Sequence, residues 1–286
     1  MPFIYRLSRA TVLDVDGQDA AAILHNLTTN DVKALELGQS CETFITDVRG
    51  KMLAHVFAYR TENGFRLIGA PGQAEAIASH ADRYTIREDA VPKDLSSEMT
   101  VYVISPEAPA SLSKETDWKE SNAAVYPLAW LGDGTSALVT DTAGAIEQVL
   151  RSLGESAGSE EEFQHARTLA GFPWYGVDVS EKNLPQEASR IQDSISFTKG
   201  CYLGQETVAR LDALGQVQKQ LVRWQCEGLV PAPGSELKSD DKVVGKLTSV
   251  AATGPDSAIA IGMARRTHFD PGSVAEGDGF RGTVVG

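Results

Sequence analysis

The sequence changes its pattern at Lys219, and this change constrains the fold more than any other feature. Before it, apolar stretches with helical spacing alternate with short β-like runs, whereas after it short β-like runs follow one another between prolines and glycines. Charge changes at the same place, because residues 219–286 hold 8 basic and 8 acidic residues and the rest holds 18 and 31. A coincident change of pattern and charge indicates a domain boundary. We therefore predict an α+β domain over residues 1–217 and an antiparallel β-barrel over residues 218–286.

Charge and cysteine content exclude several classes of function. The net charge of −13 repels phosphate backbones, so we expect no direct nucleic-acid partner. Cys41, Cys201 and Cys226 form no CxxC pair, which is typical of a reducing compartment and too few thiols for a stably bound metal. No apolar run approaches the roughly 20 residues of a membrane span, and no signal peptide is evident. We expect a cytoplasmic protein, or a mitochondrial matrix protein in a eukaryote, with no membrane partner.

The most informative segment reads Lys-Gly-Cys-Tyr-Leu-Gly-Gln-Glu at positions 199–206. Gly200 and Gly204 flank the Cys-Tyr-Leu triplet, and glycine allows backbone angles and close approaches that other residues do not. A helix is expected over residues 205–214, with Glu206 in the first turn, where a carboxylate suits the helix dipole. The segment therefore predicts a tight loop ahead of a helix.

Cys201 lies in this loop, just ahead of the helix and two residues after Lys199. A helix N-terminus and a nearby ammonium group both stabilise a thiolate. A lone cysteine is also commonly an inert core residue, so the residues alone leave both interpretations open. Glu206 and Arg210 have the i,i+4 spacing of a favourable ion pair.

The segment at 199–206 resembles the signature of the YgfZ family, whose eukaryotic relatives assist mitochondrial iron–sulfur assembly. Residues 27–32, 171–178 and 183–187 resemble elements of its relatives of the glycine-cleavage T-protein type. The resemblance covers essentially the whole chain, most densely over 171–210. It implies a T-protein-like folate-binding domain of interwoven ferredoxin-like halves around a central hole, followed by a C-terminal antiparallel β-barrel.

The resemblance also implies a site for tetrahydrofolate or a derivative. Asp178 matches the acidic residue that holds the pterin ring, Tyr175 offers a flat face, and Arg210 is a candidate for the pterin or the glutamate tail. Cys201 and Lys199 are the predicted catalytic residues. The remaining predicted cofactor-binding residues are Glu206, Gly200, Gly204, Tyr202 and Asn30. Each of the aromatic and charged residues also has an ordinary structural interpretation, as a core ring, a cap or an ion pair.

One departure from the T-protein pattern bears on activity. True aminomethyltransferases carry Gly-Gly-x-x-Asp-Asp at a turn where this sequence has Gly50-Lys51-Met52-Leu53-Ala54-His55, so Ala54 and His55 replace the acidic pair. We therefore leave open whether the protein is an enzyme.

Three hypotheses follow. The first is a folate-binding accessory protein for iron–sulfur cluster assembly or repair, with a connection to tRNA modification, whose functional thiol is Cys201 and whose partners are iron–sulfur enzymes or cluster-assembly proteins. The second is a folate-dependent aminomethyl or methyl transferase acting on an unknown amine. The third is a docking scaffold without a reactive thiol.

Overall fold

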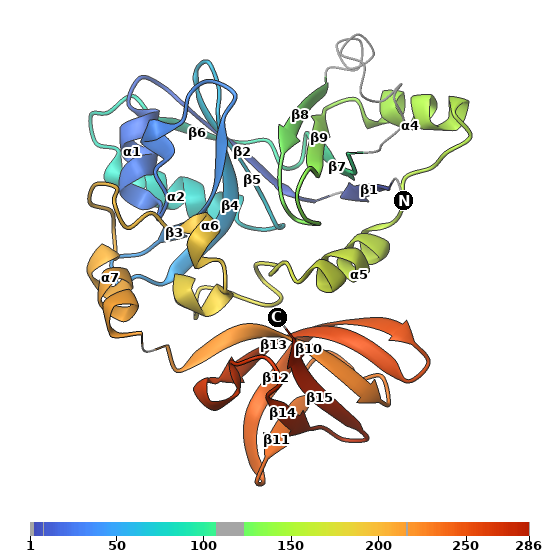
Figure 1. Ribbon diagram of the computed structural model, residues 1–286. Helices are drawn as coiled ribbons and strands as arrows, with labels where there is room; N and C mark the ends of the chain where they lie inside the picture. Colours follow the sequence, from blue (N-terminus) through green and yellow to red (C-terminus); the bar gives the residue numbers. More distant parts are fainter. Residues whose placement is uncertain (1–2, 8, 107–122, 216, 286) are drawn as a thin grey trace. The chain divides into compact units, whose positions relative to one another are not determined.

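The chain folds into two β-sheets with their helices and a closed barrel, which confirms the predicted α+β class and the C-terminal antiparallel barrel (Figure 1). The structure is a computed structural model that describes residues 3–7, 9–106, 123–215 and 217–285. Among the helices in these ranges, none is long and apolar enough to cross a membrane.

The first sheet is four-stranded and antiparallel, in the order β1-β7-β9-β8. Its strands are Ile4–Leu7, Thr100–Ile104, Ser136–Thr140 and Ala123–Pro127. Helix α4, Ala143–Ser152, packs on it because Ile146 and Leu150 share one helical face and join Tyr102 and Leu138 in one apolar cluster.

The second sheet is five-stranded, in the order β3-β4-β5-β2-β6. Its strands are Ser40–Thr46, Met52–Arg60, Gly64–Gly69, Thr11–Asp16 and Val91–Asp94, and its helices are α1, Ala20–Leu27, and α2, Ala74–Tyr84. The buried pattern of β4, in which almost every residue lies inside, is that of a central strand covered on both faces.

The barrel closes in the order β10-β13-β12-β11-β14-β15. Its strands are Lys219–Gly228, Ser257–Arg265, Lys242–Gly254, Glu236–Ser239, Val274–Glu276 and Phe280–Val285. Trp224, Leu237, Leu247 and Phe280 fill its interior, and closure removes the exposed edges that an open sheet of short strands would leave.

The connecting helices follow the expected signals. They are α5, Glu160–Ala170; α6, Ile191–Ser194; α7, Gln205–Leu214; and the 3-10 turns η1, Val32–Ala34, η2, Pro185–Ala188, and η3, Arg266–His268. Ser159 and Glu162 form a reciprocal capping box, in which the Ser159 N–H donates to Glu162 Oε2 over 2.7 Å and the Glu162 N–H donates to Ser159 Oγ over 3.2 Å. These hydrogen bonds lower the pKa of Glu162.

Four strands lack the usual local signal in the sequence. β1 and β14 are very short, β6 is largely exposed and contains Pro92, and β11 has Leu237 as its single buried residue. Very short or largely exposed strands of this kind show neither alternation nor an apolar run.

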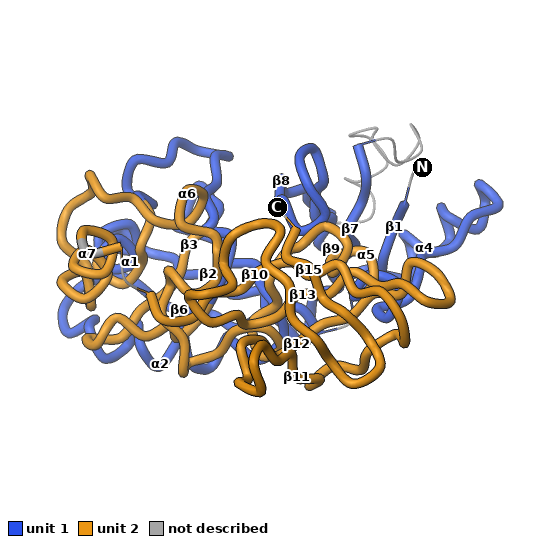
Figure 2. The backbone as a smooth tube through the Cα atoms, turned by 60° about the horizontal axis from the view of Figure 1, so that its bottom comes forward, with its two compact units in different colours: residues 1–25, 31–42, 55–164 blue, residues 26–30, 43–54, 165–286 orange. Residues whose placement is uncertain are grey.

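The structure divides into two compact units that are coloured separately in Figure 2. The first comprises residues 1–25, 31–42 and 55–164, and the second comprises residues 26–30, 43–54 and 165–286. The second unit thus joins the barrel to the segments that carry the sequence motifs. The boundary between residues 217 and 218 stays a prediction.

Candidate functional site

Lys199 anchors the signature loop within the second unit. Its Nζ donates to the carbonyl oxygens of Thr28, at 2.6 Å, and Asn30, at 3.0 Å. The ammonium also lies 5.0 Å from the centroid of the Tyr202 ring, and the residue is only 7% exposed. A buried ammonium that is held by carbonyls and an aromatic face fixes the backbone that carries it. These contacts give Lys199 a positioning role, and its role in catalysis stays a prediction.

Gly204 anchors the other end of the loop. Its φ is +80°, and a Cβ built on it would lie 2.5 Å from both Asp47 O and Gly50 Cα. Next to this close approach of two backbone segments, Thr46 Oγ1 donates to Leu203 O over 2.7 Å. Only glycine combines this backbone angle with so close an approach of another backbone.

Cys201 is the exposed thiol of the chain, between these two anchors. Cys41 is half-buried, and Cys226 lies buried inside the barrel, where burial raises its pKa to about 11. Tyr202 next to Cys201 turns inward, and burial raises its pKa to about 12. The Cys201 side chain is therefore exposed, while the buried Tyr202 side chain anchors the loop to the core. This exposure argues against the interpretation of Cys201 as an inert core residue.

The side chains of Thr29 and Asn30 hold residues 28–30 in place within the second unit. Thr29 Oγ1 donates to Ser194 O over 2.7 Å and accepts the Phe44 N–H over 3.0 Å. Asn30 Nδ2 donates to Asp193 O over 2.9 Å. Sequence reasoning missed Thr29, although the polar run after an apolar helix was a signal for buried hydrogen bonding.

Asp178 lies in a different cluster, where both of its oxygens are engaged. Oδ2 accepts from Arg167 Nη1 at 2.6 Å and from the Trp174 N–H at 2.8 Å. Oδ1 accepts from Thr248 Oγ1 at 2.5 Å and from Ser249 Oγ at 2.7 Å. A carboxylate offers about four acceptor positions, and these four bonds fill them. The contacts give Asp178 a structural role, and its role as a pterin ligand stays a prediction.

The other predicted residues divide between the core and the surface. Tyr175 is half-buried against the apolar cluster that contains Tyr202, and burial raises its pKa to about 12. Glu206 and Arg210 are exposed on α7, and among the ion pairs of the described residues none joins them. Gly200 is exposed and, unlike the glycine at the other end of the loop, does not have a positive φ.

Gln186 is a residue that sequence reasoning did not single out. It is 2% exposed, and its Nε2 donates to Val208 O over 2.7 Å. Its Oε1 is buried without a hydrogen-bond partner among the described residues. Such an atom is unusual, because nearly all buried polar atoms in proteins are hydrogen-bonded.

A buried carboxylate lies beside the residue that replaces an aminomethyltransferase aspartate. His55 Nε2 is 2.7 Å from Glu42 Oε1, and both side chains are 3% exposed. The His55 N–H in turn donates to Gln73 Oε1 over 2.7 Å. Glu42 is on β3, so its closeness to His55 on β4 was invisible in the sequence. The pair gives each residue a partner inside the first unit.

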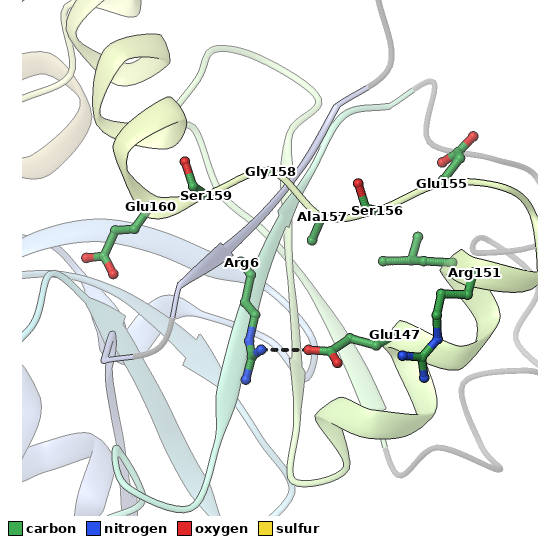
Figure 3. Close-up of a pocket in the computed structure, with 10 residues that line it drawn as sticks. Arg6, Glu147, Arg151, Glu155, Ser156, Ala157, Gly158, Ser159 and Glu160 are labelled. Atoms are coloured by element: carbon green, nitrogen blue, oxygen red, sulfur yellow. Dashed lines mark hydrogen bonds and ion pairs between the residues drawn. The ribbon is translucent and has the colours of Figure 1, made fainter.

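A pocket in the first unit contains none of the predicted site residues (Figure 3). It has a volume of about 600 Å³, and the Arg6–Glu147 ion pair, 2.6 Å long, crosses it. Its other charged lining residues are Arg151, Glu155 and Glu160. Across the described part of the chain, no group of His, Cys, Asp or Glu has the arrangement to hold a metal ion.

The fold of this protein is similar to that of the glycine cleavage T-protein. The crystal structure of the glycine cleavage system aminomethyltransferase T from Bartonella henselae matches 100% of this chain and 85% of its own, with a TM-score of 0.83 and 15% identity. No protein-family model matches the chain.

Within that class, the sequence is similar to YgfZ proteins. The tRNA-modifying protein YgfZ of Yersinia pestis is 27% identical over 242 residues, which cover 79% of this chain and 72% of that protein. A chloroplastic protein of Arabidopsis thaliana, named as a candidate transferase, is 27% identical over 265 residues, 85% of this chain. The alignment spans 60% of that protein's length. These matches confirm the resemblance to the YgfZ family that residues 199–206 predict.

Proposed function

We propose that this protein binds tetrahydrofolate or a derivative and supports iron–sulfur cluster assembly or repair through the thiol of Cys201. The observation that carries the proposal is the signature loop, which is fastened at Lys199 and at Gly204 and leaves Cys201 exposed between them. A loop held at both ends presents a nucleophile or transient ligand in a fixed position. A single thiolate cannot hold a cluster alone, so its role is to contact a cluster, iron or sulfur that belongs to a partner.

Folate binding is supported by the T-protein fold and by the chemistry of the second unit. Tyr175 supplies aromatic surface, and Gln186 Oε1 supplies a buried acceptor without a partner among the described residues. Bound tetrahydrofolate would supply a reduced pterin that carries one-carbon units. The protein's own part would be to orient that ring and to exclude water from it.

The connection to tRNA modification rests on the name of the relatives. This chain carries a net charge of −13, which disfavours direct binding of tRNA. We therefore place the protein upstream, as a factor that maintains iron–sulfur enzymes, some of which modify tRNA, and we propose no direct nucleic-acid contact.

A one-carbon transferase is the weaker alternative. The turn that carries the acidic pair in aminomethyltransferases has Ala54 and His55 here, and the nearby Glu42 carboxylate is held by His55 at 2.7 Å. A carboxylate that already has a buried partner is a poor general base for a substrate amine.

The exposed thiol gives the first prediction. In a strain that lacks this protein, the specific activity of an iron–sulfur dehydratase should fall, and wild-type protein should restore it. Cys201→Ala should fail to restore it because the presented thiol is lost, whereas Cys41→Ala should restore it fully. The measurement is dehydratase activity normalised to the amount of dehydratase, with equal expression of the variants. Normal activity in the strain without the protein, or full restoration by Cys201→Ala, would contradict the proposal.

A further inference from the structure

Residues 26–30 lie alongside the loop that carries the exposed thiol and are hydrogen-bonded to it on both sides. The Ser196 N–H donates to Thr29 O over 3.0 Å, and the Leu203 N–H donates to Asn26 O over 2.9 Å. Residues 26–30 belong to the second unit, although the chain before and after them belongs to the first. They thus supply acceptors before and after the thiol, in addition to the two carbonyls that hold the lysine ammonium of the loop.

Thr29 is the buried centre of this segment. It is 0% exposed, and its hydroxyl group makes two hydrogen bonds, since Oγ1 donates to Ser194 O over 2.7 Å and accepts the Phe44 N–H over 3.0 Å. Its backbone N–H also donates to Phe44 O over 2.9 Å. The hydroxyl group therefore joins strand β3 to the residues that lead into the loop.

The two residues that this hydroxyl group joins lie in the interior. Ser194 and Phe44 are both 0% exposed. Phe44 packs in the same apolar cluster as Tyr202, the residue that follows the thiol. Loss of the hydroxyl group would leave Ser194 O and the Phe44 N–H buried without this partner, and a buried polar group that loses its partner is costly. Relief of this cost favours movement of residues 194–196, which are continuous with the loop.

We propose that Thr29 is a positioning residue for the Cys201 thiol and acts through residues 194–196. The inference rests on the proposed function, because it concerns the presentation of the same thiol. It adds that the position of the thiol depends on a buried hydroxyl group as well as on the anchors at Lys199 and Gly204. A thiol that must contact a metal or sulfur atom of a partner needs a fixed position, since a displacement of about 1 Å can slow such a step by roughly 100-fold.

Thr11 provides a matched control for a purely structural role. It is also 0% exposed, and its Oγ1 donates to Ala70 O over 2.7 Å and accepts the Gln73 N–H over 3.1 Å. It lies on β2 in the first unit. Valine has nearly the shape of threonine but lacks the hydroxyl group, so Thr29→Val and Thr11→Val remove the same two kinds of hydrogen bond. We expect both variants to lose similar thermal stability.

Hydrogen–deuterium exchange of the full chain, measured on peptides that cover residues 194–203, tests whether Thr29 holds the loop. Exchange in these peptides should become roughly 10-fold faster in Thr29→Val and stay at the wild-type rate in Thr11→Val and in Thr29→Ser, which keeps the hydroxyl group. Asn30→Ala removes the neighbouring bond to Asp193 O without opening the core, and it should also accelerate exchange there. Wild-type exchange rates in either Thr29→Val or Asn30→Ala would overturn the proposal.

Restoration of dehydratase activity in the strain that lacks this protein separates positioning from stability. At equal amounts of soluble protein, Thr29→Val should lose most of the restoration that wild-type protein gives, whereas Thr11→Val and Thr29→Ser should restore the activity fully. Equal restoration by Thr29→Val and Thr11→Val would overturn the proposal. Full restoration by Cys201→Ala would instead contradict the proposed function, and the exchange rates would then still decide whether Thr29 holds the loop.

Discussion

Replacing Asp178 by alanine is expected to lower the free energy of unfolding by about 3–5 kcal/mol. Asp178 is 4% exposed and its carboxylate accepts from Arg167, from the Trp174 N–H, and from Thr248 and Ser249 on β12. Alanine leaves the Arg167 guanidinium buried without its counter-charge. Burial already lowers the pKa of Arg167, and the Asp178 charge opposes that effect. The loss should therefore be much larger than for any exposed ion pair.

Urea unfolding followed by tryptophan fluorescence measures this loss, since Trp174 lies at the cluster. Glu276→Ala is a matched control, because its pair with Arg281 is 3.7 Å long and exposed, and it should cost less than about 1 kcal/mol. In the double variant Asp178→Ala with Arg167→Met, part of the stability should return. If Asp178→Ala cost no more than the control, the carboxylate would not be what holds this cluster together.

Replacing Gly204 by alanine is expected to cost about 2–5 kcal/mol. The backbone angle of +80° disfavours any side chain, and the new methyl group would lie 2.5 Å from Asp47 O and Gly50 Cα. The turn at residues 47–51 and the start of α7 would have to move apart. The loop that presents Cys201 would lose one of its two anchors.

Gly176 provides the control for this variant. It has a φ of +88° in the same unit, but a Cβ there would meet nothing within 4 Å. Gly176→Ala should therefore show the backbone cost alone, about 1–2 kcal/mol. Urea unfolding of both variants measures the difference, and equal costs would show that the close approach at Gly204 does not stabilise the loop.

The sequence predicts most regular elements because their signals are local. The helix at 205–214 follows a glycine and was predicted with its observed bounds. The strand at 52–60 also has a local signal, because most of its residues are apolar. The capping box at Ser159 and Glu162 has a local signal as well, since its two hydrogen bonds join residues three apart.

The site was harder to predict because its contacts are not local. Asp178 looked free to bind a ligand, but Thr248 and Ser249, about 70 residues later, fill one of its oxygens. Glu42 meets His55 across two strands, which no spacing rule identifies. The i,i+4 spacing of Glu206 and Arg210 allowed an ion pair, yet both side chains stay in solvent, where such a pair gains little. The spacing of residues within one helix or strand predicts which of its side chains can meet. It does not predict contacts with side chains from another element.

In the motif at 199–206, the sequence anticipates the backbone of Gly204 but not the direction of the Lys199 side chain. Gly204 has the positive φ that the sequence predicts, while Gly200 does not. Lys199 was expected to act on the thiol, but its Nζ reaches back to the carbonyls of Thr28 and Asn30. A sequence shows that a lysine is near a cysteine in the chain, whereas the direction of its flexible side chain depends on acceptors more than 160 residues away.

Anaerobic calorimetric titration of tetrahydrofolate into the full chain tests whether the protein binds folate. We expect a saturable isotherm at equimolar stoichiometry that Cys201→Ala leaves unchanged, because the thiol serves a later step. Gln186→Met, which removes the buried acceptor, should weaken binding while leaving the protein folded. Folded wild-type protein that gives no binding isotherm with tetrahydrofolate would show that it is not a folate-binding protein.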